Sequence, residues 1–263
     1  MADVRPDRAY RLQEPALTVS IGGSMNRDEV AIATMTLARD AEEQRLLREA
    51  LLVLASLGIP IYVTDGGSGE EFVSDLRRIP NATVCEATSD GLWPQTRRSL
   101  EAATASGARF VLYTEPDKRD FFQHGVGALI AQANSDSSAG VVLASRSRTA
   151  YSTFPVFQQY TESVINRCCT EVTRHAFDFS YGPFILNSAI VPKLRVLEGR
   201  IAWGWRTFTF GLARTLGLRL DQLEVGSPCP RAQRDDEERG YRMLQLAQSV
   251  EGAALAARIK LEV

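Results

Sequence analysis

The stretch from Ala108 to Arg119, ARFVLYTEPDKR, places the strongest constraint on the fold of this chain. Its apolar run, Phe110 to Tyr113, is typical of a strand buried in a parallel sheet. The run ends abruptly in Glu115, Pro116 and Asp117. Ligands of open α/β sheets bind beyond the carboxyl ends of the strands, so these acids are predicted to lie at a ligand site. Glu115 and Asp117 point the same way in an extended segment and can address one divalent cation.

A loop whose acids only face water is the alternative, and for an isolated E-P-D it would be the stronger one. The rest of the chain bears on this choice because strand and helix patterns alternate along it. Further strands are predicted at Ala16 to Ile21, Ile59 to Thr64, Ala82 to Glu86, Ala139 to Ser145 and Leu218 to Val225. Helices are predicted at Arg27 to Ser56, Gly91 to Gly107, Phe122 to Asn134, Pro155 to Arg174 and Thr207 to Gly217. This alternation predicts an α/β fold with a mostly parallel central sheet, flanked by helices and joined by right-handed crossovers.

The C-terminal segment Glu237 to Leu261 predicts a terminal helix. Its apolar stripe comprises Met243, Leu246, Ala247, Val250, Ala254, Ala257 and Leu261. We expect that stripe to dock on the body of the protein or on a second subunit, which would make a homodimer. The expected organisation is a leader (1–15), one α/β domain (16–226, with halves 16–145 and 146–226), and a linker with the helix (227–263).

Composition excludes several classes of protein. With 263 residues, 44% of them hydrophobic, the chain is long enough to bury a full core. The formal charge of −2 provides no basic field for nucleic acid or an anionic membrane. The four cysteines form no C-x-x-C pair, which indicates reduced thiols and no zinc site. No apolar run is long enough for a transmembrane segment or a signal core, so we expect a cytoplasmic protein.

Three segments carry candidate nucleotide-binding residues. Gly22 and Ser24 follow the first predicted strand, where paired glycines let the backbone approach a phosphate. Asp65 begins the turn D-G-G-S after the second strand and suits a ribose hydroxyl or a base N–H, or else a helix-entry turn capped by Ser68. Arg97 lies near the start of a helix, where a bound anion explains a cation better than the helix dipole does, although a plain surface arginine is the alternative.

Two later segments are open to two interpretations each. Trp203, Gly204 and Trp205 form either a rigid apolar wall of the core, which the residues alone favour, or a platform for a sugar. Arg231 and Arg234 lie in the polar link 227–236 and either clamp a diphosphate or belong to a solvated linker.

The order of these motifs resembles the nucleotide-sugar glycosyltransferases of the GT-A fold, especially the family-2-like group. That group has a first strand, a strand that ends in an acid and D-G-S, a helix with an arginine, a strand that ends in D-x-D and then a G-W-G-like segment. The matching parts here are 16–26, 65–68, 97–107, 115–117 and 203–205. The resemblance covers residues 16–226.

The resemblance implies transfer of a sugar from a nucleotide diphosphate donor to a small acceptor, with Mg²⁺ or Mn²⁺ as cofactor. It makes Asp117 the metal ligand and a catalytic residue. Glu115 is implied to contact ribose or metal-bound water, Asp65 the nucleoside and Arg97 the donor.

The chain departs from that family at the acceptor side. Inverting members place an acid pair just after G-W-G, one acid acting as general base, whereas this chain has Arg206 and Thr207 there. The missing base favours a retaining mechanism, as in the glucosyl-3-phosphoglycerate and mannosylglycerate synthases. Their glycine-rich segment before the acceptor helix is similar to 181–186, which adds Gly182 to the implied acceptor residues. Arg206 would then bind a phosphate or carboxylate of the acceptor.

Three other functions fit parts of the sequence. A sugar-nucleotide nucleotidyltransferase shares the fold, but the segment GGSMNRDE lacks its glycine- and arginine-rich signature. A non-catalytic nucleotide-binding protein derived from a transferase fits the missing base and the cation of Lys118 beside the metal motif. A Rossmann-like phosphate binder would require a G-x-G-x-x-G after the first strand, which is absent.

Overall fold

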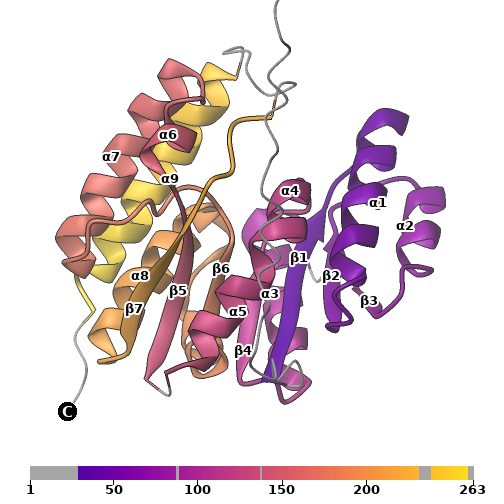
Figure 1. The fold of residues 1–263 in the computed structure, drawn as a ribbon, viewed down its shortest axis with the longest axis horizontal. Coiled ribbons are helices and arrows are strands. Elements are labelled where there is room, and N and C mark those ends of the chain that lie inside the picture. Colours follow the sequence, from indigo (N-terminus) through magenta and orange to yellow (C-terminus); the bar gives the residue numbers. More distant parts are fainter. Residues whose placement is uncertain (1–28, 87–88, 137, 231–237, 260–263) are drawn as a thin grey trace, which may run out of the picture.

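The described residues form one mixed β-sheet covered by helices on both faces (Figure 1). The computed structural model describes residues 29–86, 89–136, 138–230 and 238–259. Its seven strands have the order β3-β2-β1-β4-β6-β5-β7. They are β1 (Val30–Thr36), β2 (Ile61–Asp65), β3 (Ala82–Cys85), β4 (Phe110–Tyr113), β5 (Ala139–Arg146), β6 (Phe184–Asn187) and β7 (Arg219–Val225). The predicted α/β fold with a mostly parallel sheet is therefore confirmed.

One strand runs against the others. β6 pairs antiparallel with both β4 and β5, with Leu112 opposite Ile185 and Val142 opposite the same residue. Every other pair in the sheet is parallel. The sequence analysis did not predict β6, because Gly182 and Pro183 directly precede its four residues and made the segment resemble a loop.

The helices separate into two layers. One face of the sheet is covered by α1 (Ala41–Ala55), α2 (Glu70–Leu76), α4 (Arg119–His124) and α5 (Val126–Asn134). The other is covered by α3 (Leu92–Ala105), α7 (Val156–Thr173), α8 (Gly204–Thr215) and α9 (Arg239–Ala256). The short α6 (Arg148–Tyr151) follows β5, and two 3-10 segments, η2 (Ser188–Val196) and η3 (Gly199–Ile201), lead from β6 to α8.

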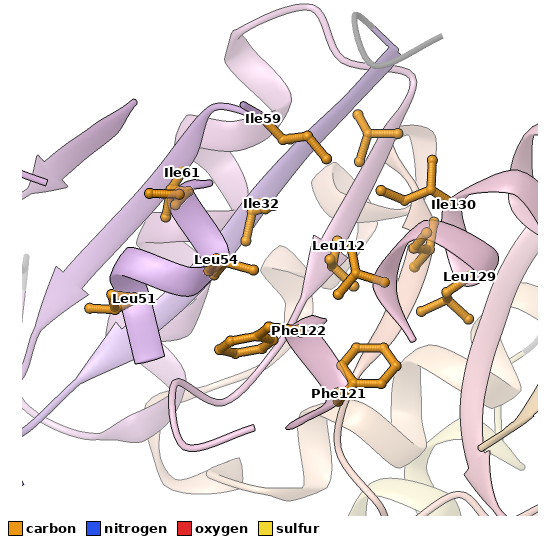
Figure 2. Packing of buried hydrophobic residues seen from close by; sticks show 14 of the residues in the cluster. Ile32, Leu51, Leu54, Ile59, Ile61, Leu112, Phe121, Phe122, Leu129 and Ile130 are labelled. Atoms are coloured by element: carbon orange, nitrogen blue, oxygen red, sulfur yellow. The ribbon is translucent and has the colours of Figure 1, made fainter. Parts of the chain in front are cut away.

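Side chains of the central strands alternate between two hydrophobic clusters. Phe110 and Leu112 of β4 pack on the α1 side, and Val111 and Tyr113 pack on the α3 side. Figure 2 shows part of the first cluster, in which Leu112 lies near Phe121 and Phe122 of α4. This two-sided burial explains why β4 is a continuous apolar run, as the sequence analysis predicted.

The prediction that Arg27 to Ser56 is helical, as two helices or one bent helix, was wrong in its first part. Val30–Thr36 is β1, the strand between β2 and β4, and the helix α1 begins only at Ala41. Small alanines at 31 and 33 made the segment look helical, but they are fully buried on the face that α3 covers. The Asp40 carboxylate accepts a hydrogen bond from the Glu43 backbone N–H (2.8 Å) and caps the helix. The strand predicted at Ala16 to Ile21 lies outside the described residues.

The terminal helix exists, but its buried face is not the predicted one. Met243 is 51% exposed, and Ala247, Ala254 and Ala257 are also exposed. The face packed on the body carries Ser249, Gly252, Ala253 and Ala256 instead. Because these side chains are small, the helix approaches α8 very closely. Leu246 of the predicted stripe packs at the edge of the second hydrophobic cluster, and Leu261 lies outside the described residues. The predicted homodimer contact through this helix stays a prediction.

Glycines set the close approach of α8 and α9. A Cβ atom on Gly252 would lie 1.9 Å from the Gly204 carbonyl oxygen, and one on Gly204 would lie 2.2 Å from the Gln248 oxygen. We expect Gly252→Ala to lower the free energy of unfolding by about 1–3 kcal/mol, since the helices must separate. Gly240→Ala in the same helix meets no atom within 4 Å and should raise it by about 0.5–1 kcal/mol. Urea denaturation of both variants checks this, and equal effects would contradict the glycine contact.

No helix among the described residues is long and apolar enough to cross a membrane.

Candidate active site

A cavity of about 680 Å³ opens where β1, β4 and β5 end. Arg39 follows β1, Arg146 ends β5, and the E-P-D segment follows β4. The opposite wall comes from α7, the segment before β6, the start of α8 and the start of α9; it includes Gln158, Ser180, Tyr181, Trp203, Tyr241 and Gln245. The cavity therefore lies at the carboxyl ends of parallel strands, where the sequence analysis placed the ligand site.

Glu115 is held in place from two sides. The Arg206 Nη1 atom donates a hydrogen bond to Glu115 Oε1 (3.2 Å), and the two side chains are only 7% and 13% exposed. The other oxygen, Oε2, is buried beside Gly182 and has no hydrogen-bond partner among the described residues. Arg206 lies in the first turn of α8, where the helix dipole disfavours a cation, so the Glu115 carboxylate compensates it.

Gly182 is required beside this carboxylate. A Cβ atom there would lie 2.1 Å from Glu115 Oε2, and the residue has a φ of +130°. We expect Gly182→Ala to displace Glu115, to destabilise the fold by about 1–3 kcal/mol and to weaken ligand binding in the cavity. Gly67→Ala is the matched control because Gly67 also has positive φ (+110°) but open space around it. Equal melting temperatures and equal ligand binding for the two variants would contradict this contact.

Asp117 and Lys118 lie together at the cavity wall. The Lys118 Nζ atom donates to Asp117 Oδ2 at 3.1 Å, and the side chains are 39% (Asp117) and 21% (Lys118) exposed. Burial opposes the charged form of Lys118, but the Asp117 and Glu115 carboxylates outweigh burial and raise its pKa. Lys118 therefore stays an ammonium ion facing both acids of the motif.

Arg146 forms a buried ionic cluster beneath the cavity. Its Nη2 atom contacts Glu162 Oε2 (2.6 Å) and its Nε atom contacts Asp178 Oδ2 (2.7 Å). The guanidinium carbon also lies 4.4 Å from the ring centre of Phe154 and 4.7 Å from that of Tyr151. Burial opposes the charged form of Asp178, but Arg146 outweighs burial and lowers the pKa of this carboxyl to about 2.

The cations of the cavity fall into two groups. Arg146 and Arg206 are nearly fully buried and paired with carboxylates of the protein. Arg39 and Arg242 are more accessible, with side chains 76% and 21% exposed, and each pairs with a carboxylate at 3.4 Å or more. Together with Lys118 they give the open side of the cavity cations that an anionic ligand can reach.

The structure separates the three residues of the W-G-W segment. Trp203 lines the cavity, and the Arg206 guanidinium lies 5.9 Å from its ring centre. Trp205 is fully buried, stacks on Trp93 at 5.5 Å and packs against Tyr113. Gly204 contacts the backbone of α9. Trp205 and Gly204 are not among the residues that line the cavity, so the acceptor role predicted for them stays a prediction.

Two predicted donor residues lie away from the cavity wall. The Asp65 carboxylate accepts hydrogen bonds from Thr36 Oγ1 and from the N–H groups of Gly67 and Ser68, so it organises the turn after β2. Arg97 lies on α3 beside Glu101, 4.0 Å away, and is not among the lining residues. Their contacts with a nucleotide stay predictions. Gly22, Ser24, Arg231 and Arg234 lie outside the described residues.

Sequence reasoning missed several residues of this wall. Arg146 is the last residue of β5, whereas the predicted strand stopped at Ser145. The reasoning that selected Glu115, a charged side chain at a strand's carboxyl end, would have selected Arg146 with a boundary one residue longer. Arg39 could have been identified only if Val30–Thr36 had been predicted as a strand. Tyr241 and Arg242 could have been identified only if the buried face of α9 had been predicted correctly.

Glu115 and Asp117 could hold a divalent cation only together with ligand atoms from a bound substrate. Among the described residues no group of three or more His, Cys, Asp or Glu side chains could hold a metal ion. Magnesium ions in enzymes are often held by one or two carboxylates together with phosphate oxygens of the substrate. Asp117 at the cavity wall and the unpartnered Glu115 Oε2 match that partial set.

Comparison with known proteins gives structural matches only. No family model matches the chain, and no curated protein matches its sequence. Glucosyl-3-phosphoglycerate synthase from Mycobacterium tuberculosis, solved with Mn²⁺, UDP and glucosyl-3-phosphoglycerate, is similar with a TM-score of 0.63 at 14% identity, over 92% of this chain and 86% of that one. Mannosyl-3-phosphoglycerate synthase from Rubrobacter xylanophilus matches with a TM-score of 0.63 at 13% identity, over 91% and 80%. The chain therefore has the fold of these synthases, the GT-A fold.

Proposed function

We propose that this protein is a glycosyltransferase that moves a sugar from a nucleotide diphosphate to a small anionic acceptor. The observation that carries this proposal is the cavity at the ends of β1, β4 and β5, in which Glu115 and Asp117 lie beside reachable cations. Structures of the same fold have been solved with UDP and Mn²⁺ or Mg²⁺. The carboxylates and the cations of this cavity suit the same kind of donor.

A divalent cation, Mg²⁺ or Mn²⁺, would be held by Asp117 with Glu115 next to it. When bound, it would neutralise charge on the leaving diphosphate. Glu115 is fixed by Arg206 and Gly182, so its carboxylate is oriented before any ligand arrives. Such preorganisation favours the transition state because no group has to be reoriented during the reaction.

We propose that the acceptor carries a phosphate or a carboxylate. Arg39 and Arg242 are the cations suited to it, since both line the cavity and remain partly exposed. Arg206, which the sequence analysis assigned to the acceptor, is paired with Glu115 and nearly buried. Its proposed role is to position Glu115. One structural neighbour has been solved with phosphoglyceric acid, an acceptor of this charge type.

The reaction is proposed to retain the anomeric configuration. The acceptor hydroxyl oxygen bonds to the anomeric carbon, the bond from that carbon to the diphosphate breaks, and the hydroxyl proton passes to the departing diphosphate oxygen. The first turn of α8 carries no carboxylate to take that proton from the opposite face of the sugar. With UDP-glucose and 3-phosphoglycerate as probes, proton NMR of the product should show the donor's α configuration. A β product would contradict retention.

A thermal-shift panel with UDP, GDP and their sugar conjugates, with and without Mn²⁺, tests the donor site. A ligand at about 100 times its dissociation constant should raise the melting temperature by roughly 5–10 °C. We expect a metal-dependent shift with one nucleotide, followed by release of that nucleotide when an acceptor is added. A shift without turnover would instead favour a non-catalytic nucleotide-binding protein, and no shift would contradict both functions.

A further inference from the structure

Lys118 places a cation of the protein itself against the acidic motif. Its ammonium lies 3.1 Å from Asp117 Oδ2, and the Glu115 carboxylate also attracts it. A divalent cation bound by Asp117 would therefore have a positive charge as its immediate neighbour, and like charges at contact distance repel strongly where solvent is limited. Lys118 and a metal ion thus compete for the same negative charge.

The lysine has room to leave. Its side chain lines the cavity and is 21% exposed, and the nitrogen lies 5.8 Å from the ring centre of Tyr181 on the neighbouring wall. A lysine side chain has a flexible four-carbon stem with a compact charge at its end. A change of its conformation can therefore move the ammonium from a carboxylate of the protein to a phosphate bound in the same cavity. A diphosphate has enough negative charge for both a divalent cation and the ammonium.

We propose that Lys118 makes divalent-cation binding at Asp117 conditional on the donor diphosphate. Without a nucleotide, the ammonium neutralises Asp117 and weakens metal binding. With a diphosphate in the cavity, the ammonium moves to a phosphate oxygen and no longer opposes a metal ion at the Asp117 carboxylate. Lys118 is thus a positioning residue that couples two ligands, and this inference rests on the proposed function.

The test measures Mn²⁺ binding directly by electron paramagnetic resonance of the free ion, on the full chain, with and without UDP. For the unaltered protein we expect UDP to tighten Mn²⁺ binding at least about tenfold, within the usual range of coupling between two sites. Lys118→Met keeps an unbranched side chain only one atom shorter and removes the charge. It should bind Mn²⁺ about tenfold more tightly than the unaltered protein when UDP is absent, and the effect of UDP should shrink.

Arg119→Met is the matched control. It removes the same charge one residue along, from an exposed arginine that pairs with Glu49. Its Mn²⁺ affinity should stay within about twofold of that of the unaltered protein. An increase equal to that of Lys118→Met would mean that any loss of positive charge nearby has the same effect, and would overturn the inference.

Two further results separate the inference from the proposed function. Unchanged Mn²⁺ affinity in Lys118→Met without UDP would overturn the role of the lysine, even if UDP binds normally. Failure of UDP to bind either protein would overturn the proposed function, while the nucleotide-free measurement still decides whether Lys118 competes with the metal. Asp117→Asn combined with Lys118→Met should lose the gained Mn²⁺ affinity, which assigns the ion to this carboxylate.

Discussion

Asp117→Asn is expected to abolish metal-dependent binding of UDP and to lower turnover at least about 10³-fold. The reason is that the substitution keeps the shape of the side chain but removes the charge that would hold a cation on the diphosphate, an effect of several kcal/mol on the transition state. The side chain is 39% exposed, so the fold should remain stable. Thermal shift with UDP and Mn²⁺, together with release of UDP from the sugar donor, measures both effects.

Asp120→Asn provides the control for that variant. Asp120 is exposed in the first turn of α4, three residues beyond Asp117, and does not line the cavity. Its loss costs only the favourable interaction with the helix dipole, about 0.3–1 kcal/mol. An undiminished, Mn²⁺-dependent UDP shift in Asp117→Asn would exclude Asp117 as the metal ligand.

Arg146→Met is expected to lower the free energy of unfolding by about 3–5 kcal/mol, because it leaves the carboxylates of Glu162 and Asp178 buried without their cation. Urea denaturation at pH 7 measures the loss. The free energy of unfolding of Arg146→Lys should lie between those of the unaltered protein and Arg146→Met. A lysine keeps the charge but lacks the planar guanidinium that contacts both carboxylates. Arg148→Met, at an exposed site two residues along, should change the value by no more than about 0.5 kcal/mol.

The same cluster predicts how stability depends on pH. The pKa of Asp178 is about 2 in the folded protein, below its ordinary value of 3.8. The stabilisation from Arg146 is therefore complete above the unfolded pKa and is lost as the pH falls from about 4 to about 2. In Arg146→Met the hydrogen bonds from Ser180 and Asn166 to Asp178 remain, but the cation that outweighs burial is gone, so the pKa of Asp178 rises. The difference in free energy of unfolding between the unaltered protein and Arg146→Met should therefore become smaller from pH 7 to pH 3. A difference that stays constant would contradict this account.

The sheet could be predicted from sequence where strands are buried on both faces. β4 and residues 139–144 of β5 are uninterrupted runs of apolar residues and glycine, and that signal depends on composition over a few residues. β1 lacks it, because alanines at 31 and 33 fill positions where α3 packs close to the sheet. Residue size at those positions is set by a helix more than fifty residues away, so no local pattern reveals it.

In the candidate site, too, local sequence predicted some residues but not the contacts between residues far apart in the chain. Glu115 and Asp117 were found because strand ends mark the ligand edge of such a sheet. The partners of these acids were not found, since the Arg206 to Glu115 contact joins residues 91 positions apart. Trp205 illustrates the opposite case. The residues alone favoured a place in the core, and only the family resemblance implied the acceptor side; in the structure its ring stacks on Trp93.

The position of α9 has a consequence for biosynthesis. Tyr241, Arg242 and Gln245 complete the cavity wall, yet they follow every strand of the sheet along the chain. A growing polypeptide can assemble the sheet and both of its helical layers except α9. It then still exposes the face of α8 at Gly204 and Gly211, on which α9 packs. The cavity wall can therefore be completed only after α9 has been synthesised. A partly synthesised chain would have the acids and the folded sheet but an incomplete cavity wall.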